Sequence, residues 1–270
     1  MGYRGHENWH DMSHHVVHFT RALDPQHLVK PQPPEDPKRW TLRQFLAEIR
    51  YIGQQDPTGY HPWMQILGEG LLRPGDKPLG AARRVPEVEH LHRVVCFSEI
   101  PLDMLDRLIE RRSLYGIGFN KGFLVSKGGA PLWYLDKEGD HASIIRAQIE
   151  ERVAAGVDPN DPFWRLMPFI DNPGNYSGRL YRFEWEREWR VIGEMSFQQG
   201  DVAFLFLPEE DHDRARQFFA DVEVENSGPA YFCPYIDARW DMNRIQEALK
   251  NVPPPPPPSQ GATPWWDDPF

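Results

Sequence analysis

The chain has 270 residues, of which 40 are Asp or Glu and 30 are Lys or Arg, so its formal net charge is −10. This excess of acidic residues argues against a general binder of polyanions, although it leaves room for a local basic patch. A composition of 40% hydrophobic and 26% charged residues is typical of a globular protein and excludes wholesale disorder. The 27 prolines, about twice the average usage, predict many loops.

The sequence also indicates the compartment. Cys96 and Cys233 are the only cysteines, which argues against a disulfide framework and fits a reducing environment. The polar, His-rich N-terminus has no apolar signal core. The longest strongly apolar run, residues 202–207, is far too short to cross a bilayer. We therefore expect a cytoplasmic protein with no membrane partner.

Short strands and helices alternate unevenly along the chain, which predicts an α+β fold. A Pro-rich insertion is expected near residues 24–40, within a single domain over residues 1–250. The expected strands are residues 16–20, 93–97, 115–119, 131–135, 184–192 and 202–207. The expected helices are residues 41–55, 62–68, 101–113, a short one opening at Asn120, 143–155, 211–220 and 241–250, with a loop over 75–92.

The C-terminal segment, residues 251–270, has a composition of its own. Pro253 to Pro258 are six consecutive prolines, which predict a polyproline II rod of about 19 Å that holds the remaining residues away from the domain. Trp265 to Phe270 (WWDDPF) combine aromatic and acidic side chains, and the last four residues, DDPF, resemble the acidic tip of bacterial single-stranded-DNA-binding proteins. We expect either a docking peptide for a partner or a tail that folds back on its own domain.

Two strands carry candidate binding or catalytic residues. His18 and Thr20 share one face of a strand and could hydrogen-bond a sugar or a carboxamide, or be ordinary edge residues. In residues 184–190 (EWEREWR), alternation would place Glu184, Glu186 and Glu188 on one face, joined by Arg190. Three aligned carboxylates are either a solvated face neutralised by Arg or a site that stabilises a cationic transition state.

Residues 96–101 and 115–119 form a third candidate region. Ser98 lies at a strand end, and the glycines of YGIGF allow a ligand or another backbone to come close. Cys96 lies in an apolar strand, where a reactive thiolate is disfavoured. The N-terminal histidines include pairs four residues apart, but the strand pattern there and the lack of a cysteine pair predict no metal site.

The order of these segments resembles the AbiGi group of phage abortive-infection proteins. The resemblance is carried by CFSEIPL (residues 96–102), by YGIGFNKGFL with GGAPLWYL after it (residues 115–135) and by EREWRV (residues 186–191), within residues 14–207. It implies a role in phage defence, as a toxin or as an antitoxin, with the other member of the pair as partner.

The same order more remotely resembles the ADP-ribosyltransferase fold, a split mixed sheet with flanking helices. That resemblance implies NAD as substrate, with a ribose contact at His18 and Thr20 and a nicotinamide contact at Ser98 or Tyr115. Glu188, with Glu186 as the alternative, would be the catalytic carboxylate that stabilises an oxocarbenium-like ribose. Arg73 or Arg190 would pair with the diphosphate.

Two functions from different classes therefore follow from the sequence. One is an NAD-dependent ADP-ribosyltransferase that modifies a nucleic acid or a protein, in which a nucleic acid enters only as substrate. The other is a non-catalytic antitoxin or interaction protein that uses the same scaffold. The carboxylates around Glu188 favour the enzyme, whereas the tail favours the binding protein. A nuclease is a weaker third hypothesis, because no carboxylate cluster suited to a metal supports it.

Overall fold

The protein is described by a computed structural model that covers residues 14–20, 59–99, 105, 113–182 and 184–257. Its centre is a seven-stranded sheet with the strand order β13-β12-β4-β1-β3-β10-β5. Neighbouring strands are antiparallel except β12 and β13, which run parallel. The strands are β1 (His15–Phe19), β3 (Val94–Ser98), β4 (Gly116–Asn120), β5 (Ala130–Pro131), β10 (Glu188–Ile192), β12 (Val202–Phe206) and β13 (Tyr235–Ile236). This mixed sheet with helices confirms the predicted α+β class.

The sheet is buried on both faces, which explains why its strands read as nearly continuous apolar runs. Val16 and Val17 are neighbours in β1, and both are almost fully buried because each packs into a different core. The larger core lies beneath α2 (Tyr60–Glu69), α4 (Lys121–Ser126) and α7 (His212–Glu225). The smaller core lies beneath α8 (Met242–Lys250).

The glycines of β4 serve packing within the protein. Gly118 lies opposite Val17, and a Cβ atom placed on it would come within 2.4 Å of the Phe204 ring. A Cβ on Gly116 would come within 3.0 Å of a Val17 methyl group. The close approach predicted for YGIGF is therefore made by side chains from β1 and β12.

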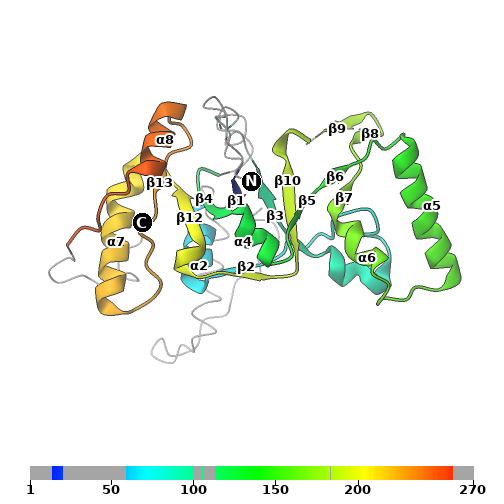
Figure 1. Ribbon diagram of the computed structural model, residues 1–270, viewed down its shortest axis with the longest axis horizontal. Helices are drawn as coiled ribbons and strands as arrows, with labels where there is room; N and C mark the ends of the chain where they lie inside the picture. Colours follow the sequence, from blue (N-terminus) through cyan, green and yellow to red (C-terminus); the bar gives the residue numbers. More distant parts are fainter. Residues whose placement is uncertain (1–13, 21–58, 100–104, 106–112, 183, 258–270) are drawn as a thin grey trace, which may run out of the picture.

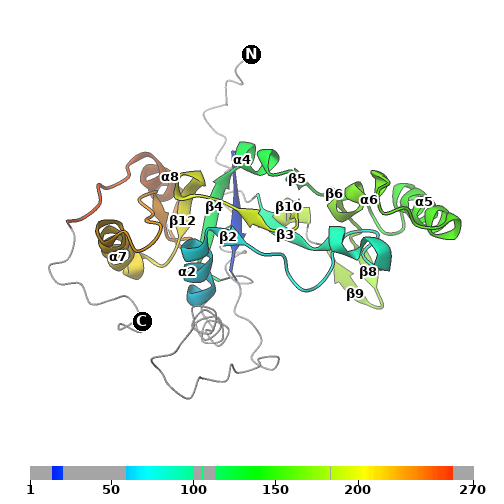
Figure 2. The same ribbon diagram turned by 90° about the horizontal axis from the view of Figure 1, so that it is seen from below.

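A lobe, defined here as residues 80–92 and 132–182, extends from the β5 edge of the sheet (Figures 1 and 2). It has its own small core, in which Trp164 and Met167 pack on Val88. Its helices are η3 (Pro86–His92), α5 (Asp140–Ala155), α6 (Phe163–Leu166) and η5 (Met167–Phe169). Its strands form two small sheets, β6 (Trp133–Tyr134) with β7 (Ile170–Asp171), and β8 (Gly174–Tyr176) with β9 (Arg179–Tyr181).

The remaining short elements join these parts. A second strand pair links the end of α2 to the turn after β10. The paired strands are β2 (Leu71–Leu72) and β11 (Met195–Ser196). Three short 3₁₀ helices lie in other connections: η6 (Glu184–Glu186), η7 (Gln199–Asp201) and η8 (Glu209–Asp211).

Three sequence predictions of structure are wrong in detail. Residues 184–192 do not form one alternating strand, because Glu184–Glu186 is a 3₁₀ turn and Arg187 has a left-handed φ of 44°. Only Glu188–Ile192 is strand, so the three carboxylates do not share a face. The loop expected over residues 75–92 contains the seven-residue helix η3, and the strand expected at 131–135 is split between β5 and β6.

The polyproline segment does not simply lead away from the domain. Gln217 of α7 donates a hydrogen bond from Nε2 to the carbonyl oxygen of Pro257 at 3.1 Å. Pro256 is half-buried, whereas Pro253, Pro254 and Pro255 are exposed. The end of the rod therefore contacts α7.

Other predictions lie outside the described residues. These are the insertion near 24–40, the helix over 41–55, nearly all of the helix over 101–113, and the docking peptide Trp265–Phe270.

Candidate functional site

The predicted residues Glu188 and Arg190 meet in a buried ion pair where the sheet joins the lobe. They are two positions apart in β10 and therefore share a face, and Arg190 Nε donates to Glu188 Oε1 at 2.8 Å. The side chain of Arg190 is only 3% exposed, and that of Glu188 is 15% exposed. Burial opposes the charge of Arg190, but the attraction of Glu188 outweighs it and raises the pKa of Arg190.

Each member of this pair also reaches into the lobe. Arg190 Nη1 donates to the carbonyl oxygen of Pro168 in η5 at 2.6 Å. The backbone N–H of Glu188 donates to the hydroxyl oxygen of Tyr134 in β6 at 3.0 Å. Because Arg190 spends its donors on one carboxylate and one carbonyl, it joins the sheet to the lobe instead of presenting a free fork to a diphosphate.

Two tyrosines and a carboxylate complete this junction on the lobe side. Tyr181 of β9 donates its hydroxyl hydrogen bond to Asp171 of β7. Burial raises the pKa of Tyr134, and burial with the nearby Asp171 raises that of Tyr181, so both hydroxyls stay protonated near neutral pH. The polar groups of the junction are therefore paired with one another. Burial together with Glu188 also raises the pKa of the neighbouring Cys96 thiol.

His18 and Glu188 do not converge on one site. Ser98 of β3 lies opposite both Val17 and Glu188, which puts these three side chains on one face of the sheet. His18 alternates with Val17 and contacts the ring of Phe97 with a centroid separation of 5.8 Å, on the other face. His18 Nδ1 is also within 2.9 Å of the Cys96 carbonyl oxygen. The register therefore separates the expected ribose contact from the expected catalytic carboxylate.

Thr20 and Tyr115 are occupied by contacts within the protein. The Thr20 hydroxyl donates to the Gly59 carbonyl oxygen at 2.8 Å and lies 2.8 Å from Ser113 Oγ. The Tyr115 hydroxyl donates to Asp211 Oδ2 at 2.8 Å, while its ring packs against Trp63. These side chains tie the end of β1 and the start of β4 to neighbouring segments.

Arg73 and Glu186 lie on other elements than the pair in β10. Arg73 follows β2 and forms ion pairs with Glu69, four residues before it, and with Glu194 at 3.7 Å. Glu186 lies in η6 and is only 4% exposed. Of the eight predicted site residues, the structure brings together Ser98, Glu188 and Arg190 and, separately, Thr20 and Tyr115, since the Thr20 hydroxyl donates to the Tyr115 carbonyl oxygen at 3.2 Å.

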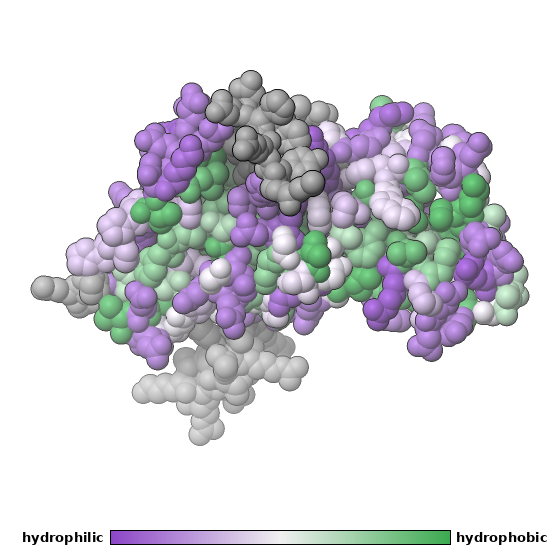
Figure 3. All heavy atoms as spheres, viewed as in Figure 1, coloured by the Kyte–Doolittle hydropathy of each residue, from purple (hydrophilic) through white to green (hydrophobic). Residues whose placement is uncertain are grey.

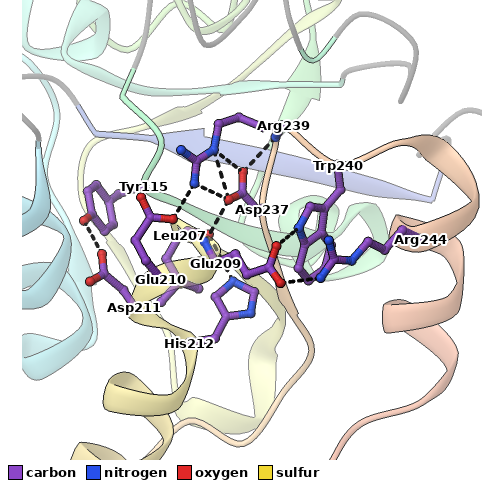
Figure 4. Close-up of polar contacts among 10 residues, drawn as sticks. All are labelled: Tyr115, Leu207, Glu209, Glu210, Asp211, His212, Asp237, Arg239, Trp240 and Arg244. Atoms are coloured by element: carbon purple, nitrogen blue, oxygen red, sulfur yellow. Dashed lines mark hydrogen bonds and ion pairs between the residues drawn. The ribbon is translucent and has the colours of Figure 1, made fainter.

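A second polar network, which the sequence analysis missed, lies beyond the ends of the parallel strands β12 and β13 (Figure 4). Asp237 follows β13 and is almost fully buried. Arg239 Nε lies 2.9 Å and 3.0 Å from the two carboxylate oxygens of Asp237, and Arg239 Nη2 lies 2.6 Å from Glu210. The backbone N–H of Glu209 donates to Asp237 at 2.7 Å.

Trp240 and Arg244 extend this network to α8. Trp240 Nε1 donates to Glu209 Oε2 at 2.8 Å, and Arg244 pairs with the other carboxylate oxygen of Glu209. Arg244 also stacks over the Trp240 ring at 4.0 Å, and His212 contacts the same ring from α7. The network therefore fixes α7 and α8 to the sheet.

The electrostatics of this network favour the charged forms of its carboxylates. Burial alone would raise the pKa of Asp237, but hydrogen bonds from Arg239 and from backbone N–H groups outweigh it and lower that pKa. Arg244 lowers the pKa of Glu209, and Arg239 lowers that of Glu210. Burial lowers the pKa of His212, which therefore stays neutral near pH 7.

A weak signal for the network exists in the sequence. Residues 208–213 (PEEDHD) follow an apolar strand, and residues 237–241 (DARWD) follow β13. Because β13 is only two residues long, its parallel pairing with β12 is not visible in the sequence pattern. The sequence therefore does not indicate that these two polar segments lie side by side.

Over the described residues, no group of three or more His, Cys, Asp or Glu side chains is arranged to hold a metal ion. The helices in the same part of the chain are all too short or too polar to span a membrane.

Comparison with known proteins identifies the family. The family model described as "Putative abortive phage resistance protein AbiGi, antitoxin" matches residues 82–218, just over half of the chain. The chain belongs to the AbiGi family. No curated protein and no solved structure matches it significantly.

The segment matched by the AbiGi model contains nearly all of the lobe, the strands from β3 to β12 and the first half of α7. The motif EREWRV, one of the segments that carry the resemblance to this family, makes structural contacts in this protein. Glu188 and Arg190 form the buried pair, and Trp189 Nε1 donates to Glu99 at 2.8 Å from the opposite face of β10. Glu99 also pairs with Lys121 at 2.7 Å and thereby ties β3 to α4.

We predict that Arg239→Gln weakens the folded state by about 2 kcal/mol at pH 7, because Asp237 loses a charged hydrogen-bond partner while it remains buried. The lowered pKa values of Asp237 and Glu210 stabilise the fold above the unfolded-state values near 4, and this contribution is lost as the pH falls below them. Urea unfolding between pH 7 and pH 3 tests both statements. The difference between wild type and variant should shrink below about pH 4, and a constant difference would contradict this account.

Proposed function

We propose that this chain is an antitoxin of an abortive-infection system and that it neutralises a cognate toxin protein by binding it through the lobe. Membership of a family described as an abortive phage resistance antitoxin supports this role. The structural observation that carries it is the distribution of exposed apolar side chains. Among the described residues, six of the nine most exposed large hydrophobic residues lie in the lobe: Trp133, Ile144, Val153, Leu166, Tyr176 and Leu180.

Exposed apolar side chains gathered on one part of a protein are typical of a protein-binding surface. In the space-filling view, hydrophobic and hydrophilic residues alternate over the lobe (Figure 3). Helix α5 illustrates the point, because Ala142 is its single buried residue and Ile144 is 59% exposed. Sixteen helical residues with so little burial gain stability when a partner covers them.

The pairing of the polar residues with one another also supports a binding role. A catalytic site needs acidic, basic or nucleophilic groups that can reach a substrate. Glu188, Arg190, Thr20 and Tyr115 all bond within the protein, and Cys96 and Cys233 are held as thiols by burial. This arrangement suits a rigid scaffold that presents a surface.

The decisive experiment replaces Ile144 with a photo-cross-linking amino acid in the native host and identifies the captured protein. We expect a protein that arrests growth when it is produced alone and that is relieved by co-production of this chain. Depletion of the chain from the host should likewise slow growth. Normal growth after depletion, together with a captured protein that is harmless alone, would contradict the antitoxin role.

We predict that Ile144→Glu weakens toxin binding by at least about 30-fold, because it replaces an exposed apolar side chain of the proposed binding surface with a charge. Val125→Glu is the matched control, since Val125 is 60% exposed on α4 outside the lobe. Both variants should unfold at the same denaturant concentration as wild type. Rescue of growth by Ile144→Glu to the wild-type level would argue against the lobe as the binding surface.

NAD-dependent ADP-ribosyl transfer stays a prediction from the sequence, with Glu188 as its catalytic carboxylate. His18 and Glu188 lie on opposite faces of the sheet, which argues against one NAD site formed by both. We expect no release of nicotinamide when the protein is incubated with NAD and cell extract. Release that falls at least about 100-fold in Glu188→Gln would establish the enzyme and displace the antitoxin proposal.

A further inference from the structure

The hairpin β8–β9 has a geometry that determines where its backbone groups point. Ser177 and Gly178 both have positive φ angles, 52° and 83°, as in the two-residue turns that connect hairpin strands. The strand register pairs Tyr176 with Arg179 next to the turn, and Asn175 with Leu180 one step further. In Figure 2 this hairpin lies at the border of the lobe.

Hydrogen-bonded and non-hydrogen-bonded pairs alternate along an antiparallel ladder. The pair beside a two-residue turn is hydrogen-bonded, so Tyr176 and Arg179 bond to each other. Asn175 and Leu180 are consequently a non-hydrogen-bonded pair. Their N–H and C=O groups therefore point outward, away from the partner strand and toward the two edges of the hairpin.

The edge formed by β8 is covered. The outward carbonyl oxygen of Asn175 accepts a hydrogen bond from Lys137 Nζ at 3.0 Å. The backbone N–H of Lys137 donates to the Pro173 carbonyl oxygen at 2.8 Å, which holds the same segment against β8. A segment that covers a strand edge in this way protects it against pairing with another chain.

The edge formed by β9 carries no such cover within the described part of the chain. Leu180 is 69% exposed, more than any other large hydrophobic residue there, and outside the β8–β9 ladder its backbone makes no hydrogen bond to a described residue. An apolar side chain beside an outward N–H and C=O is what an added strand requires.

We propose that the toxin adds an extended strand to the β9 edge and pairs with the backbone of Leu180. This inference rests on the proposed function and specifies how the lobe binds. The toxin strand carries an apolar residue against Leu180 and acidic residues beside it. The reason is charge complementarity, because residues 172–182 contain two arginines and no acidic residue. Arg182 is 58% exposed, and within the described part of the chain it pairs with Glu184 only at the long distance of 4.0 Å.

Amide hydrogen exchange of the full-length chain, alone and with the purified protein captured through position 144, tests this pairing. We expect the Leu180 amide to exchange quickly in the free chain and at least about tenfold more slowly in the complex. The Gly178 amide donates to Asn175 Oδ1 at 2.9 Å and should be protected in both states, which reports an intact hairpin.

Two variants separate backbone pairing from side-chain contact. Leu180→Val keeps the N–H donor and an apolar side chain, so its affinity for the toxin should stay within about threefold of wild type. Leu180→Pro removes the donor, and we expect a loss of at least about 30-fold with the Gly178 amide still protected.

Each alternative outcome is distinguishable. Slower exchange in α5 with an unchanged Leu180 amide would overturn strand addition and leave the antitoxin role intact. Failure to obtain a neutralised toxin would overturn both. Slower exchange at Leu180 that rises with the concentration of the chain alone would identify a second copy of this chain as the occupant and overturn the proposed toxin strand.

Discussion

The buried guanidinium of Arg190 determines how the two parts of this protein are joined. A cation removed from water is tolerated only when it is paired, and Arg190 donates to Glu188 within the sheet and to the Pro168 carbonyl oxygen in the lobe. Removing either contact would leave an uncompensated charge or a buried donor. The orientation of the lobe, and therefore of its exposed apolar residues, follows from this requirement.

This interpretation gives the EREWRV motif a positioning role. Glu188 has the residue type expected of a catalytic carboxylate, but its charge is matched by Arg190 two positions later on the same face. Trp189 uses the opposite face to reach Glu99, so one short strand fastens β3, η5 and β6 together. A rigid junction of this kind suits a protein that presents a surface, because a partner then meets a surface already in place.

The sequence predicts local structure well wherever apolar periodicity is unambiguous. The strands around Val16, Val95 and Phe204 and the helices around Leu67 and Ile245 lie where their patterns indicate. The pattern of residues 184–192 misleads, because the left-handed Arg187 ends the alternation and no residue type reveals that conformation in advance. Alternation also cannot say which strands become neighbours.

The site was harder to predict, because it depends on which strands are neighbours and in which register they pair. Only the register shows that His18 and Glu188 face opposite sides of the sheet. The pairing of Asp237 with Arg239 and Glu210 depends on a parallel strand two residues long. The open edge at Leu180 follows from two φ angles in the turn, which the letters Ser-Gly suggest only weakly.

Hydrogen exchange of Arg190→Met tests the central claim most directly, with Arg73→Met as the control for loss of an exposed ion pair. The account predicts that amides of residues 163–182 exchange at least about 100-fold faster in Arg190→Met, since breaking a buried pair costs about 3–5 kcal/mol. Amides of β12, β13 and α7 should keep their protection, and Arg73→Met should resemble wild type throughout. Equal loss of protection across both parts, or an unchanged lobe, would contradict the role assigned to Arg190.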